Sequence, residues 1–289
     1  MKWNISTVVV VAFFVATAPF ASNAQTYDEL TYKRMKSIVP NVIANAERIL
    51  KPEDRTYLDD LNIRIDRRTL TNASATFNPN TGRPEITIYT GIVLVIDLIS
   101  QIAVVQTQYP RCASEYFHYM YRHYRENTER VQSGLATQQL KTPPGFFSER
   151  KYCREAQNFV MKFPDDLAGL YNYYVEGSIT FLFLHELAHL ELEHERPSSA
   201  SQSRFQENEA DEWALKRLPE FFDVWSAFPI MIHTLMTGGI SLEEERRMSH
   251  PLGSKRLLKV IDKILETRDD PEVLRQLQSF RRQLRALID

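Results

Sequence analysis

The sequence predicts an α+β fold, in which a mostly helical domain carries one small, largely antiparallel sheet. The first observation is the alternation of apolar and polar residues over Leu61–Arg67, which is typical of a half-buried strand. The second is that Ala73–Phe77 and Glu85–Tyr89 flank Asn78–Gly82, whose Asn, Pro and Gly residues suit a hairpin turn. The third is the helical spacing of apolar residues over most of the remaining chain. We therefore expect the sheet between about residues 60 and 90.

Helices are expected before and after these strands in the chain. Residues 27–50 have apolar residues at helical spacing, although Pro40 interrupts the pattern. Gly91–Val105 is the most apolar run after residue 25, and it is too short to span a bilayer, which favours a buried helix. Pro271 is expected to begin a last, amphipathic helix.

The first 24 residues have the pattern of a secretory signal peptide. Met1-Lys2 is a weakly basic start, Val8–Ala18 is an apolar core, and Ser22-Asn23-Ala24 places small residues before a cleavage site at Gln25. The alternative is an uncleaved anchor, for which the apolar run is rather short. We expect an exported protein, periplasmic in a Gram-negative host or otherwise secreted, with no membrane span left in the mature chain.

The composition is that of an ordinary globular protein. The chain has 289 residues, of which 43% are hydrophobic and 25% are charged, with a formal net charge of −2. This balance gives no footprint for nucleic acid. Cys112 and Cys153 are the two cysteines, and in an exported protein such a pair favours a disulfide over free thiols. Closing that loop would stabilise the fold by roughly 4 kcal/mol.

The sequence His185-Glu186-Leu187-Ala188-His189 is an H-E-x-x-H motif inside an apolar, helix-forming run. Residues four apart share one face of a helix, so His185 and His189 can present two imidazoles to one metal ion. Glu186 lies beside them as a candidate base that is not itself a ligand. The alternative is a solvated helix rich in His and Glu, but the apolar residues before the motif are not typical of a solvated face.

A catalytic zinc ion usually has three protein ligands, and the third candidate is Glu207, 18 residues beyond His189. It follows Ser203-x-x-Gln206, which fits a capping box at the start of a second helix. Asp211 shares a face with Glu207, so one of the two could bind metal while the other orients a histidine. A solvated acidic stretch is the alternative for this segment, and His194 is the rival third ligand, although its spacing from His189 places it on a different face.

H-E-x-x-H followed by E-x-x-A-D resembles the gluzincin metallopeptidases, and most of all the family of the CAAX prenyl proteases and HtpX peptidases. Ser249-His250-Pro251 with Lys255-Arg256-Leu257 is similar to that family's S-H-P…E-R-[LI] segment, and Asn72–Gly91 is similar to its strand ending in T-G. Two departures stand out. Lys255 replaces the common Glu, and the short spacing before Glu207 is closer to thermolysin-like or ImmA/IrrE-like peptidases.

The resemblance implies a zincin-like domain with one Zn²⁺ per chain, held by His185, His189 and Glu207. It implies Glu186 as the general base, and His250 as a group that stabilises the transition state or gates the site. Asp211 would contact a ligand histidine, and Arg256 would support His250. The strand around Ile86–Tyr89 would offer its edge to an extended polypeptide substrate.

Taken together, these residues predict an exported zinc-dependent endopeptidase that hydrolyses peptide bonds with a metal-activated water and Glu186 as general base. The alternatives are an exported zinc-containing binding or chaperone-like module, and a latent regulatory peptidase gated by the His250 segment. We expect one domain over residues 25–289, with the metal-site core at about 170–260 and C-terminal helices at 254–289. The sequence does not indicate an oligomeric state.

Overall fold

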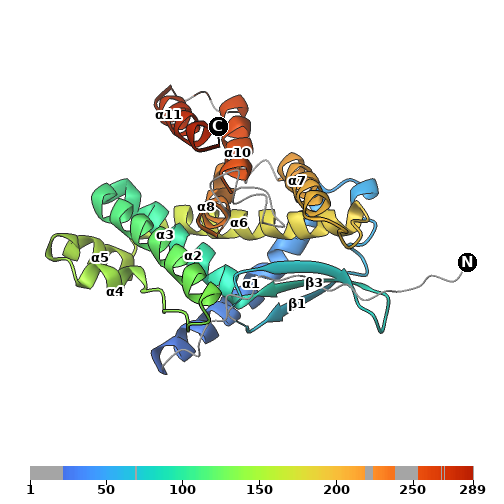
Figure 1. Ribbon diagram of the computed structural model, residues 1–289, viewed down its shortest axis with the longest axis horizontal. Coiled ribbons are helices and arrows are strands. Elements are labelled where there is room, and N and C mark those ends of the chain that lie inside the picture. Colours follow the sequence, from blue (N-terminus) through green and yellow to red (C-terminus); the bar gives the residue numbers. More distant parts are fainter. Residues whose placement is uncertain are drawn as a thin grey trace, which may run out of the picture.

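The computed structural model describes residues 22–68, 70–218, 224–237, 253–267, 269 and 271–288. Figure 1 shows helices arranged around one long central helix, with a small sheet on one side of it. In chain order the elements are α1 Ser22–Ile49, the 3₁₀ turn Pro52–Asp54, β1 Asn62–Asp66, β2 Ala73–Phe77, β3 Pro84–Tyr89, α2 Thr90–Gln108, α3 Pro110–Gln132, α4 Pro143–Ser148, the 3₁₀ turn Lys151–Cys153, α5 Arg154–Met161, α6 Asp165–Glu191, α7 Ala200–Arg217, the 3₁₀ turn Val224–Ala227, α8 Phe228–Thr237, α10 Gly253–Thr267 and α11 Pro271–Ile288.

The predicted fold class is confirmed: the described chain is mostly helical, with three strands in one sheet. The strand order is β1-β3-β2, so the last strand in sequence lies in the middle. β2 and β3 form the expected antiparallel hairpin, with Ala73 opposite Ile88. β1 pairs with β3 in parallel, with Asn62 opposite Glu85. The sheet is therefore mixed, because β3 inserts between β1 and β2 instead of extending a meander.

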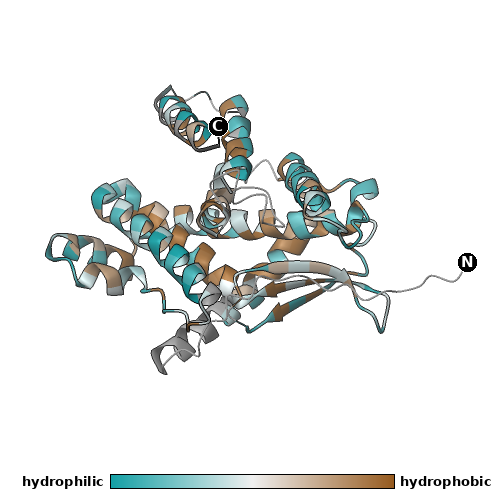
Figure 2. Cartoon of the chain, in the orientation of Figure 1, coloured by the Kyte–Doolittle hydropathy of each residue, from teal (hydrophilic) through white to brown (hydrophobic). Residues whose placement is uncertain are grey.

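α2 is a core helix. Most of its residues are buried, including Ile96 and Ile99, which are fully inaccessible to solvent. It runs for 19 residues, longer than the sequence suggested, and it is the one helix of the described chain that is long and apolar enough to cross a membrane. However, 72% of its most apolar window is buried inside the protein. Figure 2 shows that hydrophobic residues also occur in the sheet and in the middle of α6.

The other expected helices are present with shifted bounds. α1 continues through Pro40, so this proline does not end the helix. α11 begins at Pro271 as predicted and buries Leu277 and Leu284. Cys112 and Cys153 form the expected disulfide, which joins the first turn of α3 to the segment that leads into α5. The predicted signal peptide, apart from its last residues, lies outside the described part of the chain.

α6 is the helix on which the rest of the fold is organised. It packs against β2 and β3 on one side and most extensively against α7 on the other. Asp165 and Asp166 occupy its first turn, where their negative charge is favourable. From Tyr174 onward it is buried almost continuously, so the H-E-x-x-H segment lies inside the protein and not on a solvated face.

Candidate metal centre

The two histidines of the motif lie next to each other in the last turns of α6. Nε2 of His185 and Nε2 of His189 are 3.3 Å apart. His185 is 6% exposed, and the side chain of His189 is 20% exposed. The four-residue spacing on a helix therefore brings both imidazoles to one point that is almost closed to solvent.

α7 brings a carboxylate to the same point. Oε2 of Glu207 lies 3.4 Å from Nε2 of His185, and Oε1 lies 3.8 Å from Nε2 of His189. Atoms that share a tetrahedral zinc ion at about 2.0–2.1 Å lie about 3.3–3.4 Å from one another. The three side chains therefore fit one small metal ion without a large rearrangement. In the part of the chain that the structure describes, His185, His189 and Glu207 are the one group able to hold a metal ion.

The start of α7 differs from the prediction. The helix begins at Ala200, and Ser199 caps it by accepting a hydrogen bond from the backbone N–H of Gln202 at 3.1 Å. The N-cap is thus Ser199, one turn before the expected Ser203, and the side chain of Gln202 accepts from the backbone N–H of Ser198 at 2.8 Å. Buried Gln206 donates instead to the carbonyl oxygen of Glu195 at 2.9 Å, which ties α7 to the turn after α6.

Asp211 holds His185 from the side away from Glu207. Oδ1 of Asp211 lies 3.0 Å from Nδ1 of His185, at ion-pair distance but without the alignment of a good hydrogen bond. Burial opposes protonation of His185, but the carboxylates of Asp211 and Glu207 outweigh it and raise the pKa of His185 to about 10. In the absence of metal, a proton on His185 therefore neutralises part of the acidic surroundings.

Arg256, from α10, completes this side of the site. It donates from Nε and Nη2 to the two oxygens of Asp211, each at 2.6 Å, while Nη1 is 3.9 Å from Oε2 of Glu207. Burial raises the pKa of a carboxyl group, but the charges of Arg256 and His185 overcome this and lower the pKa of Asp211 to about 2. Arg256 thus contacts a residue that holds a histidine, whereas the expected contact with His250 falls outside the described residues.

Glu186 follows His185 on α6 and is 6% exposed. Its carboxylate interacts electrostatically with Arg256. Burial lowers the pKa of this guanidinium, but the charges of Asp211, Glu207 and Glu186 together raise it. Glu186 therefore lies within electrostatic reach of the cluster from the same helix, as a base beside a metal site must.

His194 contacts His189 on the side away from His185, although its spacing in the sequence predicted a position on a different face of the helix. Nδ1 of His194 lies 2.9 Å from Nδ1 of His189, and Nε2 of His194 lies 3.4 Å from Oε2 of Glu209. Burial, followed by the charge on His185, lowers the pKa of His189 to about 3, and burial also lowers the pKa of His194. His194 is not part of the group that could hold a metal ion, so it lies beside a candidate ligand and is not the rival third ligand.

The turn after α6 explains this position. His194 N–H donates to the carbonyl oxygen of His189, Glu193 N–H donates to that of Leu190, and Glu193 has a φ of 51°. This pair of bonds around a left-handed residue is a Schellman motif, which folds the chain back against the last turn of the helix. Gly or Asn usually marks such a turn, and Glu193 gave no such signal in the sequence.

The prediction that Ile86–Tyr89 offers a free strand edge to the substrate is wrong. These residues belong to β3, which is paired with β1 on one side and with β2 on the other. The sequence suggested an edge because only the hairpin could be anticipated locally. β2 is the outer strand next to α6.

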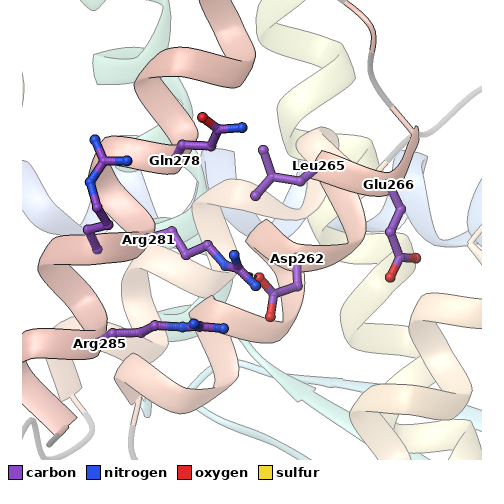
Figure 3. Close-up of a pocket in the computed structure, with 7 residues that line it drawn as sticks. Asp262, Leu265, Glu266, Gln278, Arg281 and Arg285 are labelled. Atoms are coloured by element: carbon purple, nitrogen blue, oxygen red, sulfur yellow. Dashed lines mark ion pairs between the residues drawn. The ribbon is translucent and has the colours of Figure 1, made fainter.

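A separate cavity of about 510 Å³ lies between α10 and α11, away from the histidines. In Figure 3, Arg281 extends from α11 toward Asp262 on α10, and the two form an ion pair at 2.5 Å. No residue of the histidine cluster lines this cavity. Its lining residues are Asp262, Leu265, Glu266, Gln278, Arg281, Arg282 and Arg285.

Comparison with known proteins gives one family match. The family described as Peptidase U49 matches residues 107–275, more than half of the chain, and the match contains the H-E-x-x-H motif, Glu207, Asp211 and Arg256. No curated protein and no solved structure matched the chain in the corresponding searches. A peptidase of this family acts on polypeptides, and the buried cluster described above lies within the matched segment. The chain belongs to the Peptidase U49 family.

Proposed function

We propose that this peptidase is a zinc-dependent endopeptidase of the gluzincin type. The observation that carries the proposal is the cluster of Nε2 of His185, Nε2 of His189 and the carboxylate of Glu207. The two nitrogens are 3.3 Å apart, and one oxygen of the carboxylate lies 3.4 Å from His185 while the other lies 3.8 Å from His189. A structural zinc site usually has four protein ligands, whereas a catalytic site has three and keeps one position open. Two imidazoles and one carboxylate, the carboxylate coming from the next helix, are the ligand set of the gluzincin resemblance.

The residues around the cluster have distinct roles in this proposal. His185, His189 and Glu207 would hold the ion. A Zn²⁺ ion held there would supply Lewis acidity, which activates water and polarises the carbonyl of a peptide bond. Glu186 accepts the proton of the attacking water on its carboxylate and returns it to the leaving amine. Asp211, held by Arg256, fixes the ring of His185.

The polypeptide would bind in extended form along β2. β3 is paired on both sides, whereas β2 is an outer strand that packs against α6, the helix that carries the H-E-x-x-H motif, so β2 is the strand we assign to pairing with a substrate segment. The substrate would therefore pair with Ala73–Phe77 instead of residues 86–89. His250 keeps its proposed role in stabilising the transition state or gating the site.

We also propose that the protein is exported and cleaved before Gln25. The signal-like N-terminus supports this, as does the Cys112–Cys153 disulfide, because disulfides persist mainly in oxidising compartments. Recovery of the protein from the cell envelope or the medium with Gln25 as its first residue is the expected result. Cytoplasmic protein that retains Met1–Ala24 and free thiols would contradict it.

The test of activity compares the wild type with Glu186→Gln on a complex peptide mixture, with new termini identified by mass spectrometry. The exposed Glu212→Gln on α7 is the matched control, because it makes the same chemical change on the surface. We expect wild type and Glu212→Gln to cut alike, and Glu186→Gln to bind one zinc ion but lose at least about 100-fold in rate. Undiminished cutting by Glu186→Gln would refute the mechanism. Zinc without cutting in all three proteins would indicate a latent enzyme or a binding module.

A further inference from the structure

His194 and Glu209 form a second support of the site, on the side of His189. The two Nδ1 atoms of His189 and His194 are 2.9 Å apart, which is hydrogen-bond distance. The other ring nitrogen of His194 faces Oε2 of Glu209 at 3.4 Å. The side chain of His194 is 8% exposed, so its contact with His189 is shielded from water, whereas the side chain of Glu209 is 42% exposed. One line of contacts thus runs from a carboxylate on α7, through His194, to a ligand histidine on α6.

The chemistry of these contacts selects one arrangement of protons. Two ring nitrogens can share a hydrogen bond only when one carries a hydrogen and the other a lone pair. If His194 donated to His189, the neutral His194 ring would turn a lone pair toward the carboxylate of Glu209, which is repulsive. If His189 donates, the remaining hydrogen of His194 lies on Nε2 and points to Glu209. The second arrangement avoids this repulsion and turns the N–H of His194 Nε2 toward the carboxylate at 3.4 Å, at ion-pair distance but without the alignment of a good hydrogen bond.

This arrangement has a direct consequence for metal binding. With its hydrogen on Nδ1, His189 carries its lone pair on Nε2, the atom that lies 3.3 Å from His185 and 3.8 Å from Glu207. The opposite tautomer would place a hydrogen where the ion must bind. We propose that His194 and Glu209 are positioning residues, which hold the ring of His189 in the tautomer and orientation that bind metal. This inference rests on the proposed function, because it assigns a support to the same metal site.

The backbone gives independent support. His194 reaches His189 only because the Schellman turn folds the chain back, and that turn holds Glu193 at a φ of 51°. A non-glycine residue in the left-handed region is strained relative to ordinary helical backbone. Strain of this kind persists at sites where it serves a function, and here it places a histidine against a metal ligand.

The test measures metal binding and ring tautomer, neither of which depends on turnover. Zn²⁺ affinity is determined by competition with a chromophoric chelator, and the Co²⁺-loaded proteins are compared by visible absorption. We expect His194→Ala and Glu209→Gln to lose about 10- to 100-fold in affinity and to change the Co²⁺ spectrum. His194→Gln offers an amide oxygen to His189 and should recover most of the affinity. Glu212→Gln, on the same helix, should match the wild type.

Histidine ring spectra of the metal-free protein provide the second measurement. We expect ¹H–¹⁵N correlations to show the hydrogen of His189 on Nδ1 in the wild type, with a shift toward Nε2 in His194→Ala. Unchanged affinity and an unchanged tautomer in His194→Ala would overturn the inference; Glu209→Gln serves the same purpose if His194→Ala fails to fold. A wild type that takes up no Zn²⁺ would overturn the proposed function, and the tautomer of His189 would still decide the positioning role.

Discussion

Arg256 binds both carboxylate oxygens of Asp211, through Nε and Nη2, at 2.6 Å each. Asp211 is buried and the side chain of Arg256 is 12% exposed, and the pair joins α10 to α7 directly behind His185. Because paired, planar donors fix a carboxylate in two directions, this contact sets where Asp211 can meet the imidazole. Helix α10 is therefore a structural component of the candidate metal site.

Removing Arg256 should destabilise the protein strongly. Arg256→Ala leaves the buried carboxylate of Asp211 without its partner, and we expect a loss of about 3–5 kcal/mol in the free energy of unfolding, measured by urea denaturation with chelator present. Arg256→Lys keeps the charge but not the paired geometry, so its loss should be smaller. Arg122→Ala, at an exposed position of α3, is the control and should stay within about 0.5 kcal/mol of the wild type. Equal losses for the two alanine variants would contradict the role of the pair.

Gly253 sets the position of α10. A Cβ atom at this residue would lie 2.3 Å from the carbonyl oxygen of Thr234 and 2.7 Å from Cα of Leu235, both backbone atoms of α8. We expect Gly253→Ala to cost about 2–3 kcal/mol of stability, because neither helix can yield without repacking. Gly169→Ala in α6 is the matched control: a Cβ there meets nothing within 4 Å, so it should stabilise the helix by about 0.5–1 kcal/mol. Thermal melting of both variants separates the two effects, and Gly253→Ala melting at or above the wild-type temperature would show that α8 and α10 can separate freely.

Replacing Glu193 with glycine should stabilise the protein. Its φ of 51° is strained for a side chain but not for glycine, so Glu193→Gly should raise stability by about 0.5–1 kcal/mol. Glu193→Ala is the control, since it removes the contact with the Tyr57 hydroxyl, at 3.4 Å, without relieving the backbone. Denaturant midpoints should rank glycine above wild type, and wild type at or above alanine. A glycine variant that is less stable than the wild type would show that the side-chain contact outweighs the strain, and one that is less stable than alanine would show that glycine relieves no strain here.

His233 gives the protein a pH-dependent stability that is independent of the metal ligands. It is buried on α8, and this burial, followed by the charge of Arg256, lowers its pKa to about 4. The unfolded chain binds a proton near pH 6.5 while the folded chain does not, so stability is complete above about pH 6.5 and declines as the pH falls toward 4. A shift of this size corresponds to about 3 kcal/mol.

The check is to follow urea denaturation of the metal-free protein from pH 7 to pH 4, in parallel with His233→Gln. The variant lacks the titrating ring, so its stability should decline less steeply over this interval. His118→Gln, at an exposed histidine of α3, should behave as the wild type. Identical pH profiles for the wild type and His233→Gln would rule out the effect.

The sequence predicted the parts of the site that depend on helical spacing. His185 with His189, and Glu207 with Asp211, are each four residues apart, and a helix fixes the geometry of such pairs. His194 was misplaced because the same spacing was applied beyond Glu191, where the helix ends. No glycine marks that end, so only the three-dimensional backbone reveals the turn.

Two other differences between the prediction and the structure also arise from contacts that a local sequence pattern does not specify. Ser199-x-x-Gln202 and Ser203-x-x-Gln206 are equivalent capping patterns in the sequence, and packing of Gln206 against the carbonyl of Glu195 decides between them. The parallel pairing of β1 with β3 joins segments more than 20 residues apart, which no local pattern specifies. The hairpin of β2 and β3 was predictable because its turn chemistry is local.

The disulfide has a consequence for a peptidase that can cut its own chain. Cys112 and Cys153 enclose the exposed segment around Ser133–Ala136, where Gly134 turns the chain at a φ of 69°. Exposed loop tips of this kind are the preferred sites of proteolytic nicking. A cut between the two cysteines leaves both pieces covalently joined through sulfur, with α3 on one piece and the H-E-x-x-H helix on the other. Self-digestion in this loop would therefore produce a two-chain enzyme rather than two fragments.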